Sequence, residues 1–186
     1  MQVVLLIAYT ILILLLSEVV RKFREKAKKA KEESLEVQFL LFGSGAEEAL
    51  LKEFVKENHL DNVIFPGRLP NKEMYTVLKY ADMSFISLVN ENLKDSIPTK
   101  MYEALGVGCP ILLAAVGDSV NVLNDCKLGI AVQPNDEEAL WNAFYKMYQT
   151  LPNIVLHKEN AVKTIIEKYS RQKAATKMEK VLKEIC

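Results

Sequence analysis

The chain of 186 residues has few of the side chains that build metal sites and disulfide frameworks. It contains two histidines and three cysteines, and no two cysteines form a CxxC pair. An odd number of cysteines, with Cys109 and Cys126 in apolar surroundings, indicates reduced thiols and a cytoplasmic protein. Because no potential ligands cluster along the chain, the sequence predicts no metal site.

Neither sign of charge is in excess. Lys plus Arg and Asp plus Glu total 24 each, so the net charge is zero and nothing favours nucleic acid as a partner. Basic residues do gather in residues 21–31, with seven against one acid. Such a segment is typical either of a solvated helix face or of contact between residues 3–31 and an anionic membrane surface.

The chain also lacks a clean apolar run of the roughly 20 residues that span a membrane. Residues 3–16 are almost wholly apolar, and the run continues to Val20 past Ser17 and Glu18. Residues 1–20 therefore have two interpretations: a strand at residues 3–9 followed by an apolar helix start, or an anchor that holds residues 21–186 at the cytoplasmic face. A cleaved signal peptide does not fit, because the basic residues follow the apolar run.

From residue 37 onward, short apolar runs alternate with longer amphipathic stretches. Strands are expected at residues 36–42, 62–65, 83–89, 111–115 and 129–132. Helices are expected at residues 46–58, 71–80, 99–107, 119–125, 136–148, 159–169 and 171–185, with Asn71 and Asp136 as N-caps. This order predicts an α/β fold: a single Rossmann-like domain with a parallel sheet of five to six strands and helices on both faces.

In such a sheet, ligands bind beyond the carboxyl ends of the strands. The loops there are residues 43–45, 66–69, 90–99 and 116–119. The first contains Gly43 and Gly45, but it matches neither the GxGxxG nor the P-loop pattern. Taken alone it is either a phosphate loop or a plain turn between a strand and a helix.

The third loop carries the most informative stretch. Asp95 and Glu103 flank Pro98, and a helix is expected to start just after the proline. The free N–H groups of its first turn, with the charge of Lys100, would form a seat for phosphate. An anion site between two acids predicts a ligand with phosphates and hydroxyls, such as a nucleotide sugar. The alternative is a capping motif, with Thr99 as the cap and Glu103 on the surface.

Seven fragments occur in an order that resembles the C-terminal half of family 4 retaining glycosyltransferases of the GT-B class. The likeness covers about Leu14 to Ile185, and its best part is Phe39 to Pro134. It is closest to the subgroup that transfers N-acetylated amino sugars, such as N-acetylfucosamine, in surface polysaccharide assembly. The fragments are Leu41–Gly45, Asn62–Gly67, Ala81–Ser87, Ile97–Ala104, Gly108–Ile111, Gly117–Ser119 and Leu128–Val132.

This resemblance implies a role for each site residue. Glu103 matches the second acid of the E-x7-E pattern and would hold the ribose hydroxyls. Asp95 falls on the first acid, a glutamate in the family, and would face the donor sugar as the catalytic residue. The remaining positions would bind the donor: Gly43 and Gly45 near the phosphates, Gly67, Arg68 and Leu69 beside the base, and Ile97, Thr99 and Lys100 at the phosphates.

The same resemblance implies a UDP- or GDP-sugar as substrate and no cofactor or metal. Positive charge and N–H groups would stabilise the departing diphosphate. The acceptor-binding half of the family is not encoded in this chain. We therefore expect a donor-binding domain that is inactive alone and needs a missing N-terminal domain or a separate acceptor-binding subunit. Two other hypotheses are a non-catalytic nucleotide-binding module and a membrane-tethered interaction domain.

Overall fold

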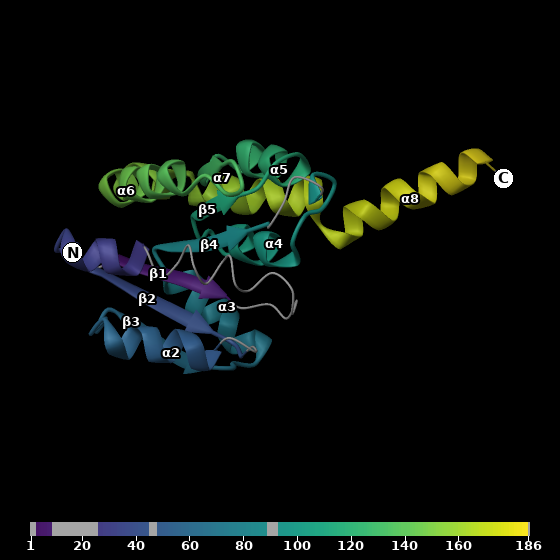
Figure 1. Cartoon of the computed structure of the whole chain (residues 1–186). Coiled ribbons are helices and arrows are strands. Elements are labelled where there is room, and N and C mark those ends of the chain that lie inside the picture. Colours follow the sequence, from purple (N-terminus) through teal and green to yellow (C-terminus); the bar gives the residue numbers. More distant parts are fainter. Residues whose placement is uncertain (1–2, 9–25, 45–47, 89–92, 186) are drawn as a thin grey trace.

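The computed structural model describes residues 3–8, 26–44, 48–88 and 93–185, and it has one parallel sheet at its centre (Figure 1). The sheet has six strands in the order β3-β2-β1-β4-β5-β6, and each neighbouring pair is parallel. This confirms the predicted α/β fold class. The strands are β1 (Val3–Ala8), β2 (Val37–Phe42), β3 (Val63–Gly67), β4 (Met83–Ser87), β5 (Ile111–Ala114) and β6 (Gly129–Val132).

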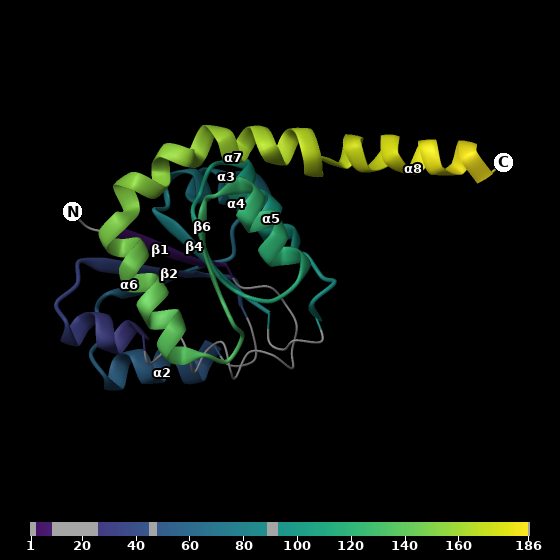
Figure 2. The same cartoon turned by 90° about the horizontal axis from the view of Figure 1, so that it is seen from above.

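Helices cover both faces of the sheet. The residues at 26–32 are helical, and the labelled helices are α2 (Glu48–Glu57), α3 (Asn71–Tyr80), α4 (Thr99–Gly106), α5 (Asp118–Cys126), α6 (Glu137–Ile154), α7 (Lys158–Thr164) and α8 (Arg171–Ile185). A 3-10 turn, η2 (Val155–His157), and a π-helical turn, η3 (Ile165–Tyr169), complete the list. Residues 26–32, α2 and α6 share one apolar core with the sheet, and α3, α4, α5 and α7 share the other. Figure 2 shows these two layers on opposite sides of the strands.

The apolar N-terminal run begins with β1, which lies between β2 and β4. The Val4 backbone N–H donates a hydrogen bond of 2.8 Å to Asp82 Oδ2, and Val3 is buried. Residues 3–8 therefore form the strand that one of the two interpretations predicted. The helix start expected after it and the basic residues up to 25 lie outside the described residues. Among the helices of the described ranges, none combines the length and apolarity needed to cross a membrane.

Two expectations about helix ends are wrong. Asn71 is not an N-cap, because Pro70 takes that position with φ −57° and ψ 147°, and no side chain caps the helix. Helix α6 was expected to end near Tyr148, but it continues through Pro152 to Ile154. The buried side chain of Leu151 favours this extra turn, because it packs into the core while the proline ring stays exposed.

The expected cap of α6 is confirmed, since Asp136 Oδ1 accepts a 2.8 Å hydrogen bond from the Ala139 N–H. Asp136→Ala should lower the free energy of unfolding by about 0.5–2 kcal/mol, because that N–H loses its partner. Asp136→Asn keeps an acceptor oxygen and should cost much less. Urea denaturation of both variants tests this prediction, and equal losses would contradict the capping role.

Cys109 and Cys126 are free thiols, and both are buried. Burial raises the pKa of Cys109 to about 12 and that of Cys126 to about 11. At neutral pH both side chains are therefore protonated core residues rather than nucleophiles.

Candidate functional site

The strand order reverses between β1 and β4, which is where open parallel sheets bind ligands. A cavity of about 270 Å³ opens at the carboxyl edge of this sheet, below the loops that follow β2 and β3. It is lined by Phe42, Gly43, Ser44, Arg68, Leu69, Asn71, Met74, Leu78, Ser84, Lys100 and Glu103. Residues from two strands, two loops and two helices thus converge on one site.

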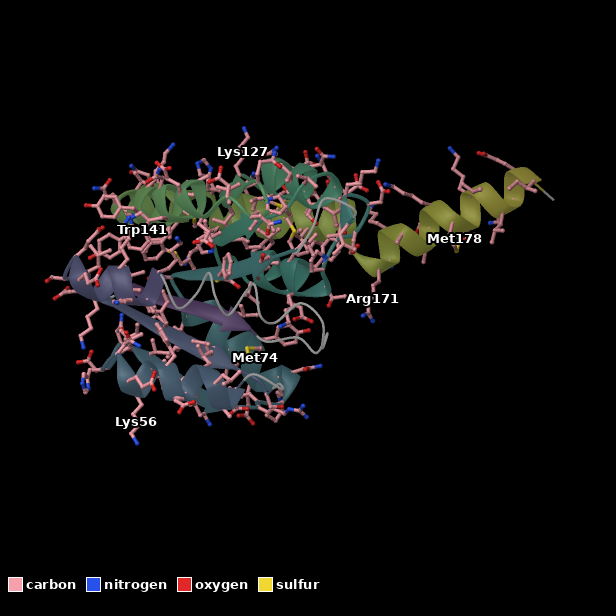
Figure 3. The ribbon with its side chains drawn as sticks, viewed as in Figure 1. Lys56, Met74, Lys127, Trp141, Arg171 and Met178 are labelled. Atoms are coloured by element: carbon pink, nitrogen blue, oxygen red, sulfur yellow. The ribbon has the colours of Figure 1, made fainter. Side chains whose placement is uncertain are left out.

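Two helices supply facing walls of the cavity. Helix α3 contributes Asn71, Met74 and Leu78, whose spacing places them on one side of the helix (Met74 is labelled in Figure 3). Helix α4 contributes Lys100 and Glu103, which are one turn apart. One wall is therefore mostly apolar and the other is charged, which suits a ligand with a flat apolar part and a polar, anionic part.

The loops after β2 and β3 are tied to each other above the cavity. The Arg68 Nε–H donates a 2.8 Å hydrogen bond to Ser44 Oγ. The Gly43 N–H donates a 2.8 Å hydrogen bond to the Gly67 carbonyl oxygen. These two bonds hold Arg68 at the edge of the cavity, where its side chain stays exposed, and the sequence alone could not show this placement.

Lys100 is the cation of the charged wall. Its side chain is half-buried, and burial lowers its pKa to about 8, although the nearby Glu103 carboxylate opposes that shift.

Thr99 is not the cap of α4, because Pro98 is the N-cap residue and no side chain caps this helix. An anion placed in the cavity would meet the ammonium group of Lys100 and the positive end of the α4 dipole together.

Asp95 lies on a separate, exposed turn that does not line the cavity. This turn is fastened to the start of α5. The Asp118 N–H donates a 2.8 Å hydrogen bond to the Lys94 carbonyl oxygen, and the buried Ser119 hydroxyl donates a 2.7 Å bond to the Ser96 carbonyl oxygen. The loop at 116–119 therefore positions the Asp95 turn.

The structure brings together five of the predicted site residues, which line the cavity: Gly43, Arg68, Leu69, Lys100 and Glu103. Gly67, the last residue of β3, is absent from the lining, as are Asp95, Ile97 and Thr99, and Gly45 lies outside the described residues. The prediction missed the other lining residues: Phe42, Ser44, Asn71, Met74, Leu78 and Ser84. The helical spacing of Asn71, Met74 and Leu78 was a signal that could have found one wall.

A six-stranded parallel sheet in this order, with its cavity at the carboxyl edge, defines a Rossmann-like α/β domain. The sequence profile described as "Glycosyl transferases group 1" matches residues 13–150. The chain therefore belongs to the group 1 glycosyltransferase family.

Curated relatives match only part of the chain. The putative colanic acid biosynthesis glycosyltransferase WcaL of Escherichia coli (strain K12) is 26% identical over 119 residues, which is 62% of this chain and 29% of WcaL. Its counterpart in Salmonella typhimurium is 25% identical over 119 residues, with the same coverage. The chain thus spans less than a third of these relatives.

Solved structures share the fold over nearly the whole chain. Staphylococcus aureus TarM, in a complex that contains UDP, has a TM-score of 0.79 at 16% identity and covers 96% of this chain, which corresponds to 35% of TarM. Sucrose-phosphate synthase of Thermosynechococcus elongatus has a TM-score of 0.78 at 18% identity. The match covers 99% of this chain and 45% of the synthase. The pneumococcal O-GlcNAc transferase GtfA, solved with UDP and GlcNAc, has a TM-score of 0.75 at 17% identity. The match covers 98% of this chain and 35% of GtfA. The chain thus has the fold of about one half of a GT-B protein.

Proposed function

We propose that this chain is the donor-binding domain of a glycosyltransferase that moves a sugar from a nucleotide-sugar to an acceptor. The observation that carries the proposal is the single cavity that joins Lys100 and Glu103 of α4 to the Gly43 and Arg68 loops. Solved neighbours of the same fold were obtained with UDP, which supports a nucleotide as the ligand.

Each wall of the cavity then has a part of the donor to bind. The Glu103 carboxylate accepts hydrogen bonds from the ribose hydroxyls, and Lys100 with the start of α4 neutralises the diphosphate. Leu69 and Met74 contact the base, with Arg68 held above them by Ser44. Asp95, on the turn outside the cavity, faces the donor sugar once an acceptor half closes the site.

The proposal extends to the rest of the enzyme. Because the chain spans 29% of WcaL, the acceptor site belongs to a further domain or a separate subunit. We place the domain in the cytoplasm with a UDP- or GDP-sugar as donor, no metal and an N-acetylated amino sugar as the group transferred. The colanic acid relatives support a role in polysaccharide assembly.

Titration calorimetry with UDP, GDP and their sugars tests the donor assignment. One of the two diphosphates should bind with 1:1 stoichiometry, and the addition of EDTA should leave its affinity unchanged. If neither nucleotide nor any of their sugars binds, the donor assignment is wrong. A metal requirement for binding would contradict the metal-free site.

The affinity for the diphosphate should fall as the pH rises through about 8. Lys100 has a lowered pKa of about 8, so it is a cation below that value and loses its charge above it. A bound anion favours the charged form and moves the fall to somewhat higher pH. The measurement is the dissociation constant at pH 7 and pH 9, a range in which the phosphate charge is nearly constant.

Lys100→Arg serves as the control, because a guanidinium stays charged at both pH values. The variant should bind with little difference between pH 7 and pH 9. An equal loss of affinity at pH 9 in the variant and the natural chain would assign the pH effect to another group.

A further inference from the structure

Two serines, Ser84 and Ser119, are buried among the described residues, and their hydroxyl groups differ in what they bond. Ser84 is 2% exposed and Ser119 is 0% exposed. The Ser119 hydroxyl donates a 2.7 Å hydrogen bond to the Ser96 carbonyl oxygen. Within the described ranges the Ser84 hydroxyl has no hydrogen-bond partner. Burial of a hydroxyl without a partner is unfavourable, so the presence of Ser84 in the apolar strand β4 needs an explanation.

The Ser84 side chain points from the sheet into the cavity of the candidate site. Side chains alternate along a strand, so Ser84 shares a face of β4 with Ile86, which packs in the same core as α3 and α4. Leu78 of α3 and Glu103 of α4 line the cavity together with Ser84. The Ser84 backbone N–H is already used in a 2.7 Å hydrogen bond to the Pro110 carbonyl oxygen. The hydroxyl therefore forms a polar point on the floor, between walls that come from two helices.

The surroundings of this hydroxyl suit the base of a nucleotide better than its other parts. A diphosphate needs positive charge, which Lys100 and the start of α4 supply, and ribose hydroxyls need an acceptor such as Glu103. The α3 wall instead presents Met74 and Leu78, which suit a flat ring. A ring against this wall points one edge at the floor. Base edges carry N–H and carbonyl groups, and a serine hydroxyl can pair with either.

We propose that the Ser84 hydroxyl forms a hydrogen bond with the edge of the donor's nucleobase and contributes to the choice of base. This inference rests on the proposed function, since it requires a nucleotide in the cavity. The bond forms in a buried place, where a hydrogen bond is electrostatically stronger than in water. A base that presents a C–H group to this point leaves the hydroxyl unpaired and binds more weakly.

Titration calorimetry with UDP and GDP at pH 6.5, where Lys100 is charged, tests the proposal. Ser84→Ala should weaken binding of the preferred diphosphate by about three- to tenfold, which corresponds to the loss of one neutral hydrogen bond. The ratio between the affinities for UDP and GDP should shrink with it. Ser84→Thr keeps a hydroxyl and suits a strand, so it should retain most of the affinity.

A ligand without a base separates the base contact from a contact with ribose or phosphate. Ribose 5-phosphate, measured by competition with the diphosphate, should bind the natural chain and Ser84→Ala equally. Ser87→Ala is the matched control for the diphosphates. Ser87 belongs to the same strand, its Oγ is also buried without a partner, and its position in the alternation puts it on the opposite face of the sheet. This variant should leave both affinities unchanged.

Urea denaturation without ligand separates a binding role from a structural one. Ser84→Ala should leave the unfolding midpoint unchanged, because the hydroxyl has no protein partner to lose. Ser119→Ala should lower the midpoint, because it removes the hydrogen bond to Ser96. A fall for Ser84→Ala as large as that for Ser119→Ala would make Ser84 a structural residue and overturn the proposal.

The binding results distinguish failure of this inference from failure of the donor assignment. If Ser84→Ala binds UDP and GDP like the natural chain, the base contact is wrong, whereas the donor assignment stands. If the variant loses affinity for ribose 5-phosphate to the same extent, the hydroxyl contacts the ribose instead, and the base contact is again wrong. If the natural chain binds neither diphosphate, the donor assignment and this inference are both wrong.

Discussion

Glu103→Ala should weaken binding of the nucleoside diphosphate by at least about tenfold. The Glu103 carboxylate lines the cavity, and each charge-assisted hydrogen bond that it makes to a ribose hydroxyl contributes roughly 1.5–3 kcal/mol. Loss of one such bond corresponds to about a 10- to 100-fold weaker dissociation constant. Calorimetry with the natural chain and the variant gives this ratio directly.

The pH of that comparison matters, because Glu103 also raises the pKa of Lys100. Its removal would lower the Lys100 pKa further and weaken phosphate binding near pH 8. A measurement at pH 6.5 keeps Lys100 charged and isolates the ribose contribution. Glu73→Ala, which removes an exposed acid from the first turn of α3, is the matched control and should have no effect. If Glu103→Ala binds like the natural chain at pH 6.5, the ribose role is wrong.

Gly117→Ala should lower the free energy of unfolding by about 3 kcal/mol. Gly117 has φ +71°, and a Cβ atom there would lie 2.1 Å from the Lys94 carbonyl oxygen. Backbone atoms cannot turn away as a side chain can, so the Asp95 turn would have to leave the start of α5. The Asp118–Lys94 hydrogen bond would be lost with it.

Gly67→Ala separates this clash from the strain of a positive φ. Gly67 has φ +81°, but no atom lies within 4 Å of the added Cβ, so only the backbone strain of about 1 kcal/mol remains. Thermal or urea denaturation of both variants should show a clearly larger loss for Gly117→Ala. Equal losses would mean that the Asp95 turn moves freely and that its attachment to α5 contributes nothing.

The sequence predicted the sheet well because the pattern that marks each strand, an apolar run followed by turn residues, is local in the chain. Runs such as residues 37–42, which are buried or half-buried, and 111–115, which are wholly buried, each end at turn residues, so their apolar composition marks them as strands. Residues 3–8 are equally apolar, but a central strand and a membrane segment have the same composition. Composition alone therefore could not decide between these two structures for residues 3–8. The pairing of β1 with Asp82 and β4, which is a tertiary contact, distinguishes them.

The candidate site was predicted only where a motif lies on a loop after a strand or at the start of the helix that follows it. Lys100 and Glu103 were found because a helix start follows Pro98. Asn71 was assigned to a cap, because the sequence could not show that the preceding proline would take that position and leave the amide to face the cavity. Leu78 lies in no recognised fragment, and Ser84 lies in one to which no site role was given. Both line the cavity because α3 and α4 pack together on the sheet.

The central place of β1 has a consequence for the order of folding. Val3 pairs with Val37, and Leu5 pairs with Met83, so β1 cannot complete its hydrogen bonds until β4, which lies far along the chain, has been synthesised. Before that point its apolar surface is exposed during synthesis, which slows folding and favours aggregation or capture by a chaperone. The strand order that creates the ligand site therefore also makes the nascent chain vulnerable.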